Sequence, residues 1–449
     1  MEERLEESGL TSRSGRVALT AVATDLVDVD SQAVSQDPLQ WPGYQEQLRA
    51  AEARSGETES VVVAEGTVGG RRVTLVGFNF DFLGGSMGEA TGERIAQAFA
   101  HSRTRRQPLV SLVASGGARM QEGMRSLVQM QRLAAACAEA RTEGIPHISV
   151  VRNPTTGGVW VSLASTADVI LGVTGANVSF AGSRVRGDAG EESRPFTAGG
   201  KQASGFIDAE TSAEQLPAML DRYIALLGDR AEPAPCPVPD MLAVQAPPAT
   251  GWQAVQRARS EDRPRALAYL DRYFTERVQI SGDRAGGKDE GMLCGFGRRD
   301  GRTVAYAAQT GSRNSAAGFR TATRLFRLAE RLRIPILTLI DTPGAEHTAA
   351  AEQAGIGTAI GETFVAVSEL SVPVTSLVIG EGGSGGALAL AAPGRLWATP
   401  DSYFSVIAPE GAAAILFRDS SRAADAADNL RLGPADLVAL GISAGVTES

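Results

Sequence analysis

Two pairs of adjacent glycines stand where an extended apolar segment gives way to an apolar, helix-like one. Gly157-Gly158 lies in NPTTGGVWVSLA and Gly385-Gly386 lies in VIGEGGSGGALALA. The first turn of a helix offers N–H groups without intrahelical partners and a partial positive charge, and glycine lets another atom come close to the backbone. Such fixed donors can form an oxyanion hole. Two of these loops would suit a reaction with two developing oxyanions; the alternative is that the glycines only let strand and helix pack tightly.

The second loop also fits a nucleotide-binding pattern. Residues 380–385 satisfy GxGxxG, and Asp401 follows nineteen residues after Gly382, as in a dinucleotide fingerprint. That fingerprint belongs to the first strand–helix turn of its fold, whereas this loop follows two or more strands and helices of its own half. No lysine follows Lys288, which excludes a Walker A loop. We therefore expect the loop to hold an enolate oxygen and not a pyrophosphate.

The same order of elements occurs twice in the chain, and this repeat positions both loops. Each half begins with a strand hairpin, whose turns are Gly69-Gly70 and Asp300-Gly301. An amphipathic helix follows at 92–106 in the first half and at 322–333 in the second. A buried strand then ends in a small-residue loop, and a second helix leads to the strand before each Gly-Gly pair.

The spacing of the loops is the same in both halves. The offset from Gly117 to Gly158 (158 − 117 = 41) equals the offset from Gly344 to Gly385 (385 − 344 = 41). Equal spacing with few shared residue identities indicates one architecture used twice. Alternating strands and helices predict an α/β fold with crossover connections.

Composition changes along the chain predict its division into parts. Residues 1–55 are expected to be an N-terminal arm, partly disordered, whose weakly patterned part (1 to about 40) has room for one short helix. Residues 56–231 form the first domain, and 252–449 form the second. The segment 232–251 contains six prolines in twenty residues, and this density predicts a linker because proline breaks helices and sheets.

Composition also narrows the class of function. The net charge of −9 argues against nucleic acid as a partner, and no apolar run approaches the ~20 residues of a membrane span. The charged start of the chain does not resemble a signal peptide. Three cysteines lie far apart in the sequence, which excludes a CxxC zinc site and makes a reducing cytoplasm the expected location.

Longer motif strings resemble one enzyme family. ASGGARMQEGMRSLVQM and NPTTGGVWVSLAS are similar to the β subunit of bacterial acetyl-CoA carboxylase carboxyltransferase. GFRTATRLFRLAERLRIPILTLIDTPGA and VIGEGGSGGALALAAPGRLWATPDSYFSVIAPEGAAAILF are similar to its α subunit. The resemblance covers about residues 60–185 and 250–440 and implies a β-like half fused to an α-like half. It also implies two tandem crotonase-like (ββα superhelix) domains.

The resemblance implies a reaction and roles for particular residues. The family moves CO₂ from N1 of carboxybiotin to the α-carbon of an acyl-CoA such as acetyl-CoA. Two oxyanion holes receive the ureido oxygen of biotin and the thioester enolate oxygen, and their order stays open. The holes correspond to Gly157, Gly158, Gly385 and Gly386, and the loop expected along the CoA pantetheine and thioester corresponds to Ser115, Gly116, Gly117 and Ala118. Ala389 falls where related enzymes tune acyl-chain length.

No protein base is expected, because the biotin enolate left after CO₂ release is basic enough to take the acyl-CoA α-proton. His101 and His147 are expected to be structural, and His347 follows DTPGAE without a catalytic assignment. Arg119 has two alternatives: it pairs with a CoA phosphate, or it fixes Glu122 locally. The predicted product, malonyl-CoA or a homologue, would serve fatty acid or polyketide biosynthesis.

The chain departs from the family pattern in several places. It cannot make the four-cysteine zinc ribbon of the β family, so no zinc is expected. Residues 186–208 form a loose, charged segment, and residues 346–362 are alanine-rich and helix-prone. There is no biotin-acceptor Met-Lys-Met string. We therefore expect a separate biotin carboxyl carrier protein and a biotin carboxylase as partners, and a homodimer or higher homo-oligomer. Two alternatives remain: a biotin-independent malonyl-thioester decarboxylase and a non-catalytic subunit of a carboxylase complex.

Overall fold

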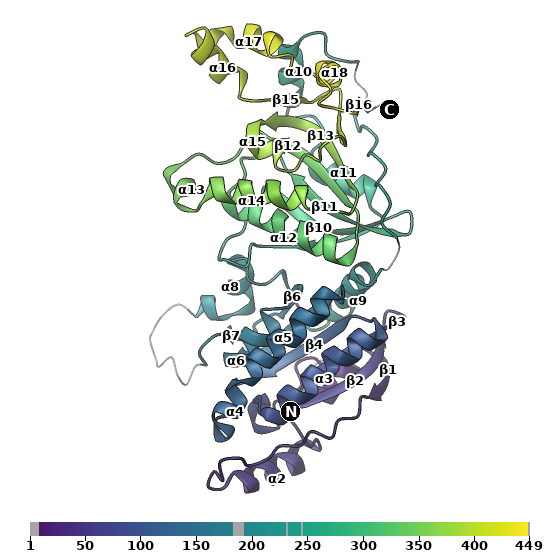
Figure 1. Cartoon of the computed structure of the whole chain (residues 1–449), viewed down its shortest axis with the longest axis vertical. Coiled ribbons are helices and arrows are strands. Elements are labelled where there is room, and N and C mark those ends of the chain that lie inside the picture. The colour runs from purple at the N-terminus through teal and green to yellow at the C-terminus, as the bar shows by residue number, and fades with distance from the viewer. Residues whose placement is uncertain (1–8, 183–192, 230–231, 244–245, 448–449) are drawn as a thin grey trace, which may run out of the picture. The chain divides into compact units, whose positions relative to one another are not determined.

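The computed structural model describes residues 9–182, 193–229, 232–243 and 246–447. The chain divides into two compact units, Met1–Asp229 and Arg230–Ser449, and each is described by itself (Figure 1).

The sheet of unit 1 begins antiparallel and continues parallel. Its strands lie in the order β1-β2-β3-β4-β5-β6-β8, and β7 pairs with the end of β5. The hairpin predicted at Gly69-Gly70 joins β2 to β3, which confirms the turn. Every residue of β4 is buried, as expected for a parallel strand covered on both faces. The strands are β1 (Thr24–Asp28), β2 (Val61–Val68), β3 (Arg71–Phe78), β4 (Leu109–Ser115), β5 (His147–Thr156), β6 (Val169–Val173), β7 (Val178–Ser179) and β8 (Ala209–Thr211).

Two long helices, α3 and α5, pack on each other and support this sheet. Helix α3 puts Ile95, Ala98 and Phe99 into the core on a helical period and ends at Arg106, which has a left-handed φ of 51°. The longer helices of the unit are α1 (Gly15–Thr20), α2 (Tyr44–Ser55), α3 (Glu89–Arg105), α4 (Met124–Leu127), α5 (Gln129–Thr142), α8 (Ala198–Ala203) and α9 (Leu216–Leu227).

The N-terminal arm differs from the prediction. Residues 9–55 contain two helices, α1 and α2, and β1, which pairs antiparallel with β2. Gly15 packs so closely on the backbone of Gly77 that a Cβ there would lie 2.5 Å from the Gly77 carbonyl oxygen. The described part of the arm is therefore integrated into unit 1. Its weak hydrophobic pattern gave no sign that Leu19 and Tyr44 are buried together with small residues such as Ala18 and Ala51.

Unit 2 repeats the arrangement. Its strands lie in the order β16-β14-β13-β12-β11-β10-β9, and β15 pairs with the end of β13. The predicted turn at Asp300-Gly301 joins β10 to β11 and is also confirmed. The strands are β9 (Glu276–Ile280), β10 (Met292–Arg299), β11 (Arg302–Gln309), β12 (Ile336–Thr342), β13 (Val374–Gly383), β14 (Leu396–Ala398), β15 (Tyr403–Ser405) and β16 (Gly445–Val446).

Several helices of unit 2 pack on this sheet. Helix α12 contacts β10 and β11 and packs on α14; its left-handed C-cap, Arg333, has a φ of 58°. The alanine-rich segment is helical, as predicted, in α13 and α14. The helices are α10 (Gly251–Ala258), α11 (Ala266–Tyr273), α12 (Ala316–Leu332), α13 (Ala349–Gln353), α14 (Ile356–Ser368), α15 (Ser384–Leu388), α16 (Pro409–Leu416), α17 (Ala423–Asn429) and α18 (Pro434–Ala439).

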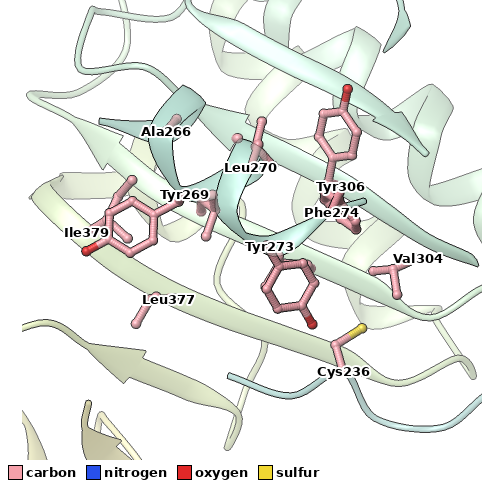
Figure 2. Close-up of a cluster of buried hydrophobic side chains, with 13 residues drawn as sticks. Cys236, Ala266, Tyr269, Leu270, Tyr273, Phe274, Val304, Tyr306, Leu377 and Ile379 are labelled. Carbon is pink, nitrogen blue, oxygen red and sulfur yellow. The ribbon is translucent and has the colours of Figure 1, made fainter. Parts of the chain in front are cut away.

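The proline-rich segment before α10 packs on unit 2. Figure 2 shows Cys236 beside Tyr273 of α11 and Val304 of β11, within a buried cluster that also takes Leu377 and Ile379 from β13. The carbonyl of Cys236 accepts a hydrogen bond from Thr375 Oγ1 at 2.9 Å. This segment has no regular secondary structure in its described residues. Side-chain hydrogen bonds and apolar contacts hold it in place.

The two units keep one residue register through their central elements. The offset in numbering between the first residues of α3 and α12 (316 − 89) is 227, and the offset between the first residues of β5 and β13 (374 − 147) is also 227. Beyond the glycine loops the offset becomes 226. Val150 and Leu377 correspond at an offset of 227 (377 − 150), but their partners on the next strand, Leu171 and Trp397, differ by 226 (397 − 171). Unit 1 therefore has one extra residue between its glycine loop and β6. That stretch, Trp160–Ala164, is a π-helix, in which Ser165 N donates to Trp160 O at 2.8 Å.

Candidate functional site

In unit 1 the small-residue loop after β4 lies against the glycine loop after β5. Ser115 pairs with Thr155, and Thr156 Oγ1 donates to the Ser115 carbonyl at 3.2 Å. A Cβ on Gly157 would lie 2.9 Å from the Cα of Gly117. Gly157 also has a φ of 65°, a conformation that glycine adopts without penalty. The loop predicted to lie along the pantetheine and thioester and the first predicted oxyanion-hole loop are thus brought together.

Unit 2 brings its corresponding loops together more closely still. Thr342, at the end of β12, pairs with Gly382 of β13. A Cβ on Gly383 would lie 2.3 Å from the Pro343 carbonyl carbon, and one on Gly386 would lie 2.6 Å from the Ala345 amide nitrogen. These glycines are required by backbone approach. Gly385 differs, because a Cβ there would meet nothing within 4 Å.

The backbone of each small-residue loop is fixed in the same way in both units. Gly117 N donates to Ser115 Oγ, and Gly344 N donates to Thr342 Oγ1, each at 3.1 Å. The loop of unit 1 is also bridged to Met87, whose amide donates to the Gly117 carbonyl at 2.8 Å.

The matching bridge in unit 2 is made by Asn314. Its amide donates to the Gly344 carbonyl at 3.4 Å, and its own carbonyl accepts from Glu346 N at 2.9 Å. Met87 and Asn314 are related by the same offset as the helices and strands around them (314 − 87 = 227). The repeat therefore extends to individual backbone hydrogen bonds around the candidate site.

The register corrects one part of the sequence analysis. At an offset of 227, Gly385 corresponds to Gly158, and the counterpart of Gly157 is Ser384, which has a similar left-handed φ of 58°. Gly386 corresponds to Val159. The pairs Gly157/Gly158 and Gly385/Gly386 are therefore displaced from each other by one residue. Matching doublets by identity overlooked this shift, although the equal spacing from Gly117 to Gly158 and from Gly344 to Gly385 already indicated it.

Ala389, the predicted chain-length position, directly follows α15. It is fully buried, and its amide donates to the Gly385 carbonyl at 3.0 Å, whereas the neighbouring Leu388 is exposed. Its assignment to acyl-chain selection stays a prediction. Asp401, the ribose candidate of the nucleotide alternative, is buried in unit 2.

Arg119 takes the local alternative. Its side chain is fully buried and forms ion pairs with Glu59 at 2.5 Å and Glu122 at 3.2 Å. With no exposed guanidinium surface, this placement opposes pairing with a CoA phosphate. The small loop residues before it (Ser115, Gly116, Gly117 and Ala118) keep their backbone beside the glycine loop.

A charged layer beneath the unit 2 glycine loop was not predicted. Asp341, buried on β12, pairs with Arg263 at 2.6 Å, and its Oδ1 accepts from Glu381 N at 3.1 Å. The Glu381 carboxylate accepts from Arg259 Nε at 2.9 Å and from Tyr403 OH at 2.8 Å. The only sequence signal was an aspartate at the end of an otherwise apolar strand pattern. Its partners lie too far away in the sequence for a local pattern to identify them.

Two of the three histidines lie away from the loops, and the third, His347, is exposed next to Glu346. His147 is buried on β5, where Nε2 lies 3.0 Å from Ser111 Oγ, and burial lowers its pKa to about 4. His101 lies 3.7 Å from Glu65.

Within the described residues, no group of three or more histidine, cysteine, aspartate or glutamate side chains could hold a metal ion. Nor does any helix in that part of the chain have the length and apolar character needed to cross a membrane. The segment at 186–208 that was expected to be loose lies outside the described residues up to 192; the remainder includes α8.

Solved structures resemble this architecture. The structure of the 12S transcarboxylase hexamer with methylmalonyl-coenzyme A and methylmalonic acid bound aligns over 100% of this chain and 88% of that one, with a TM-score of 0.81 and 22% identity. A single-chain, multi-domain long-chain acyl-CoA carboxylase aligns over 97% of this chain and 46% of its own, with a TM-score of 0.76 and 18% identity. These likenesses confirm the predicted fold class, α/β with two tandem crotonase-like domains.

Sequence comparisons establish the relationship. The family model described as acetyl co-enzyme A carboxylase carboxyltransferase-like matches residues 247–448. The acetyl-coenzyme A carboxylase carboxyl transferase subunits beta/alpha of Salinispora tropica are 40% identical over 423 residues, covering 89% of this chain and 75% of the relative. The protein named probable biotin-dependent acyl-coenzyme A carboxylase beta3 subunit of Mycobacterium bovis is 36% identical, covering 90% and 84%. The chain therefore belongs to the acetyl-CoA carboxylase carboxyltransferase family, with its β-like half before its α-like half.

Proposed function

We propose that this carboxyltransferase moves the carboxyl group of carboxybiotin, presented by a separate carrier protein, to the α-carbon of an acyl-CoA. The observation that carries the proposal is the repeated loop pair. In each unit, a glycine loop lies against a small-residue loop, and the glycine loop begins with a residue of left-handed φ. Backbone hydrogen bonds connect the small-residue loop to the residues that precede a long helix. Two similar loops suit two oxygens that gain negative charge in turn.

The roles of the residues follow from this arrangement. Backbone N–H groups of Gly157 and Gly158 would stabilise one oxygen, and those of Gly385 and Gly386 the other. The backbone of Ser115, Gly116, Gly117 and Ala118 would lie along the pantetheine and thioester. Fixed donors and positioning can supply most of the rate enhancement, because preorganised dipoles need no reorientation as charge develops.

Biotin would supply the carboxyl group while attached to a biotin carboxyl carrier protein, which a biotin carboxylase would load. A Cβ at Gly385 would meet no atom within 4 Å, so the backbone of the unit 2 glycine loop is open to an approaching group at that residue. The product would be malonyl-CoA or a homologue for fatty acid or polyketide biosynthesis. We place the reaction in the cytoplasm; the three buried cysteines, none in a disulfide, are compatible with a reducing compartment.

A homodimer or higher homo-oligomer is part of the proposal. Several large apolar side chains are exposed on α15 and around α16 of unit 2, as are others near α4 of unit 1. Apolar surface of this kind is typical of protein interfaces. In unit 2 they are Leu388, Val406, Ile407, Ile415 and Leu416, and in unit 1 they are Met120, Met124, Leu127 and Val128.

The test is an acyl-CoA panel with and without a biotinylated carrier protein and biotin carboxylase. We expect carboxylation that requires the carrier, and decarboxylation of malonyl-CoA or a homologue with free biotin as acceptor. Malonyl-thioester decarboxylation that needs no biotin would instead support the decarboxylase alternative. Absence of turnover with every acyl-CoA would contradict the proposal.

A matched pair of variants tests the loop directly. Gly385→Leu should abolish turnover because the side chain would occupy the space beside the proposed donors. Gly361→Leu is the control, since that glycine of α14 is exposed and its Cβ would also meet nothing within 4 Å. If a carboxylase complex that contains the Gly385→Leu variant keeps full activity, this chain is a non-catalytic subunit or its active site lies elsewhere.

A further inference from the structure

We propose that Arg119 is a positioning residue that couples the N-terminal arm to the acyl-CoA loop at residues 115–118. This inference rests on the proposed function for the identity of that loop. The sequence suggested only two roles for Arg119, a phosphate partner or a local contact. The contacts around it reach much further along the chain.

The guanidinium of Arg119 is fully buried and lies at the centre of a hydrogen-bonded cluster. Nη2 donates to Glu59 Oε1 at 2.5 Å and to the Ser86 carbonyl at 2.8 Å, and Nη1 donates to Glu122 Oε1 at 3.2 Å. Nε donates to Ser86 Oγ at 3.2 Å. The guanidinium also lies over the ring of Phe82, 5.4 Å from its centroid. Five donors in a fixed plane allow one arginine to join several chain segments at once.

The arm supplies two hydroxyl groups to this cluster. Tyr44, the first residue of α2, is fully buried and donates to Glu122 Oε1 at 2.7 Å. Ser35 Oγ contacts both Arg119 Nη1 and Glu59 Oε2. The arm therefore completes the hydrogen bonding of two buried carboxylates. The arm makes further polar contacts elsewhere, such as Arg13 with Asp81, but these two hydroxyl groups both reach the cluster of Arg119, the residue that directly follows Ala118.

The same cluster fixes the acyl-CoA loop from the other side. Arg119 N donates to the Met87 carbonyl at 2.9 Å, beside the Met87–Gly117 hydrogen bond described above. Glu122 Oε2 accepts from Glu89 N at 2.6 Å, at the first turn of α3. Gly88 leaves the space that this needs, because a Cβ there would lie 2.4 Å from Glu122 Oε1. A shift of Arg119 would therefore move both segments that are joined by the bridge, the one at Met87 and the loop at Gly117.

Electrostatics favours the charged forms within this cluster. Burial alone would raise the pKa of Glu59, but the Arg119 guanidinium outweighs it and holds that pKa below its usual value. Two carboxylates face one guanidinium, and the first turn of α3 adds positive charge beside Glu122. A buried ion cluster of this kind is costly to disrupt on one side only, since the remaining charge loses its partner.

Unit 2 fixes its corresponding loop without such a cluster. The counterpart of Arg119 at an offset of 227 is Glu346, which is half-buried. There a single carboxylate, Asp289, accepts from Ser315 N at 2.8 Å at the start of α12 and from Gly291 N at 2.7 Å. A buried arginine is therefore not required to build the loop. What it adds in unit 1 is the connection to the arm.

The experiment removes the arm's hydroxyl groups and leaves Arg119 in place. The double variant Ser35→Ala/Tyr44→Phe should speed amide hydrogen exchange at residues 115–119 by about tenfold, because charged groups lose buried hydrogen bonds. It should raise KM for acyl-CoA by a similar factor, with KM for the biotinylated carrier unchanged. Arg119→Met should have a larger effect on both measurements, and Arg119→Lys should recover part of the exchange protection.

Tyr273→Phe is the matched control. It also removes one buried tyrosine hydroxyl, which donates to the Pro237 carbonyl at 2.9 Å in unit 2. It should leave exchange at 115–119 and KM for acyl-CoA unchanged. Unaltered exchange and KM in the double variant would overturn the inference even if Arg119→Met fails to fold. Hydrogen exchange does not depend on turnover, so an inactive wild-type enzyme would count against the proposed function while the coupling was still measured.

Discussion

The glycine loops of the two units have the same backbone course and reach it with different residues. Unit 1 has Thr156 and Gly157 where unit 2 has Gly383 and Ser384. In unit 1 the closest approach is at Gly157, against the Cα of Gly117; in unit 2 it is at Gly383, against the carbonyl of Pro343. The left-handed φ is needed at the same position in both, yet unit 2 meets it with a serine.

This difference separates the requirements that glycine satisfies. A close backbone approach excludes a Cβ absolutely, whereas a positive φ is a moderate cost that a non-glycine residue can bear when its surroundings hold it. Glycine identity in the sequence therefore does not show which requirement applies. Substitutions at equivalent positions of the two units can separate them.

The largest expected effect is at Gly383. Gly383→Ala should lower the free energy of unfolding of unit 2 by about 3 kcal/mol, because the methyl group would meet backbone atoms that cannot move aside. Its counterpart Thr156→Ala should cost only about 1 kcal/mol, the value of one hydrogen bond from Thr156 Oγ1 to the Ser115 carbonyl. Denaturant unfolding of both variants measures the difference. Equal losses would refute the distinction.

The second prediction concerns acid stability. His147 on β5 corresponds to Val374 on β13, so unit 1 alone has a buried imidazole there. Burial lowers its pKa to about 4 in the folded protein, below the ~6.5 of an unfolded chain. The unfolded state therefore binds more protons as pH falls from about 6.5 to about 4, and unit 1 should lose about 3 kcal/mol in that window.

Replacing the imidazole should remove this dependence. His147→Val copies the residue of unit 2, and the unfolding free energies of wild type and variant, measured from pH 7 to pH 4, should differ in slope below about pH 6.5. The wild-type unfolding free energy would fall toward acid pH by about 3 kcal/mol more than that of the variant. Parallel curves would show that another group controls the acid response.

The smallest effects concern the left-handed position itself. Gly157→Ala should cost about 2 kcal/mol from the positive φ and the contact with Gly117, and it should lower turnover because the loop would shift. Ser384→Gly should change stability by less than about 1 kcal/mol, since glycine relieves the φ cost and adds flexibility to the unfolded chain. Thermal unfolding and kcat of the two variants test this. A large loss in Ser384→Gly would mean that the serine side chain has a role of its own.

Much of the fold could be predicted because its signals are local. Hairpin turns at Gly69-Gly70 and Asp300-Gly301, helix periodicity and buried strands all depend on residues close in sequence. The equal spacing between the small-residue loop and the glycine loop in each half then indicated that the two halves share one architecture. The helical segment after Glu346 was also predicted from composition, and α13 and α14 confirm it.

The rest depends on contacts between distant residues. Arg263 meets Asp341 from 78 positions away, and Tyr44 meets Glu122 from the same distance. No periodic pattern indicates such pairs, so the arm's place in unit 1 and the inward direction of Arg119 could not be predicted. The one-residue displacement of the glycine doublets was missed because residue identity does not show backbone position.

The π-helix at Trp160–Ala164 has a consequence for the history of the chain. An alignment of the two halves needs no gap from Met87 to Gly158 and then a single-residue gap before β6, and the π turn marks where it belongs. A helix can absorb one added residue as a wider turn, whereas a strand that slips by one residue turns every side chain to the opposite face. The insertion or deletion that distinguishes the copies was thus retained where it leaves both the glycine loop and the next strand in register.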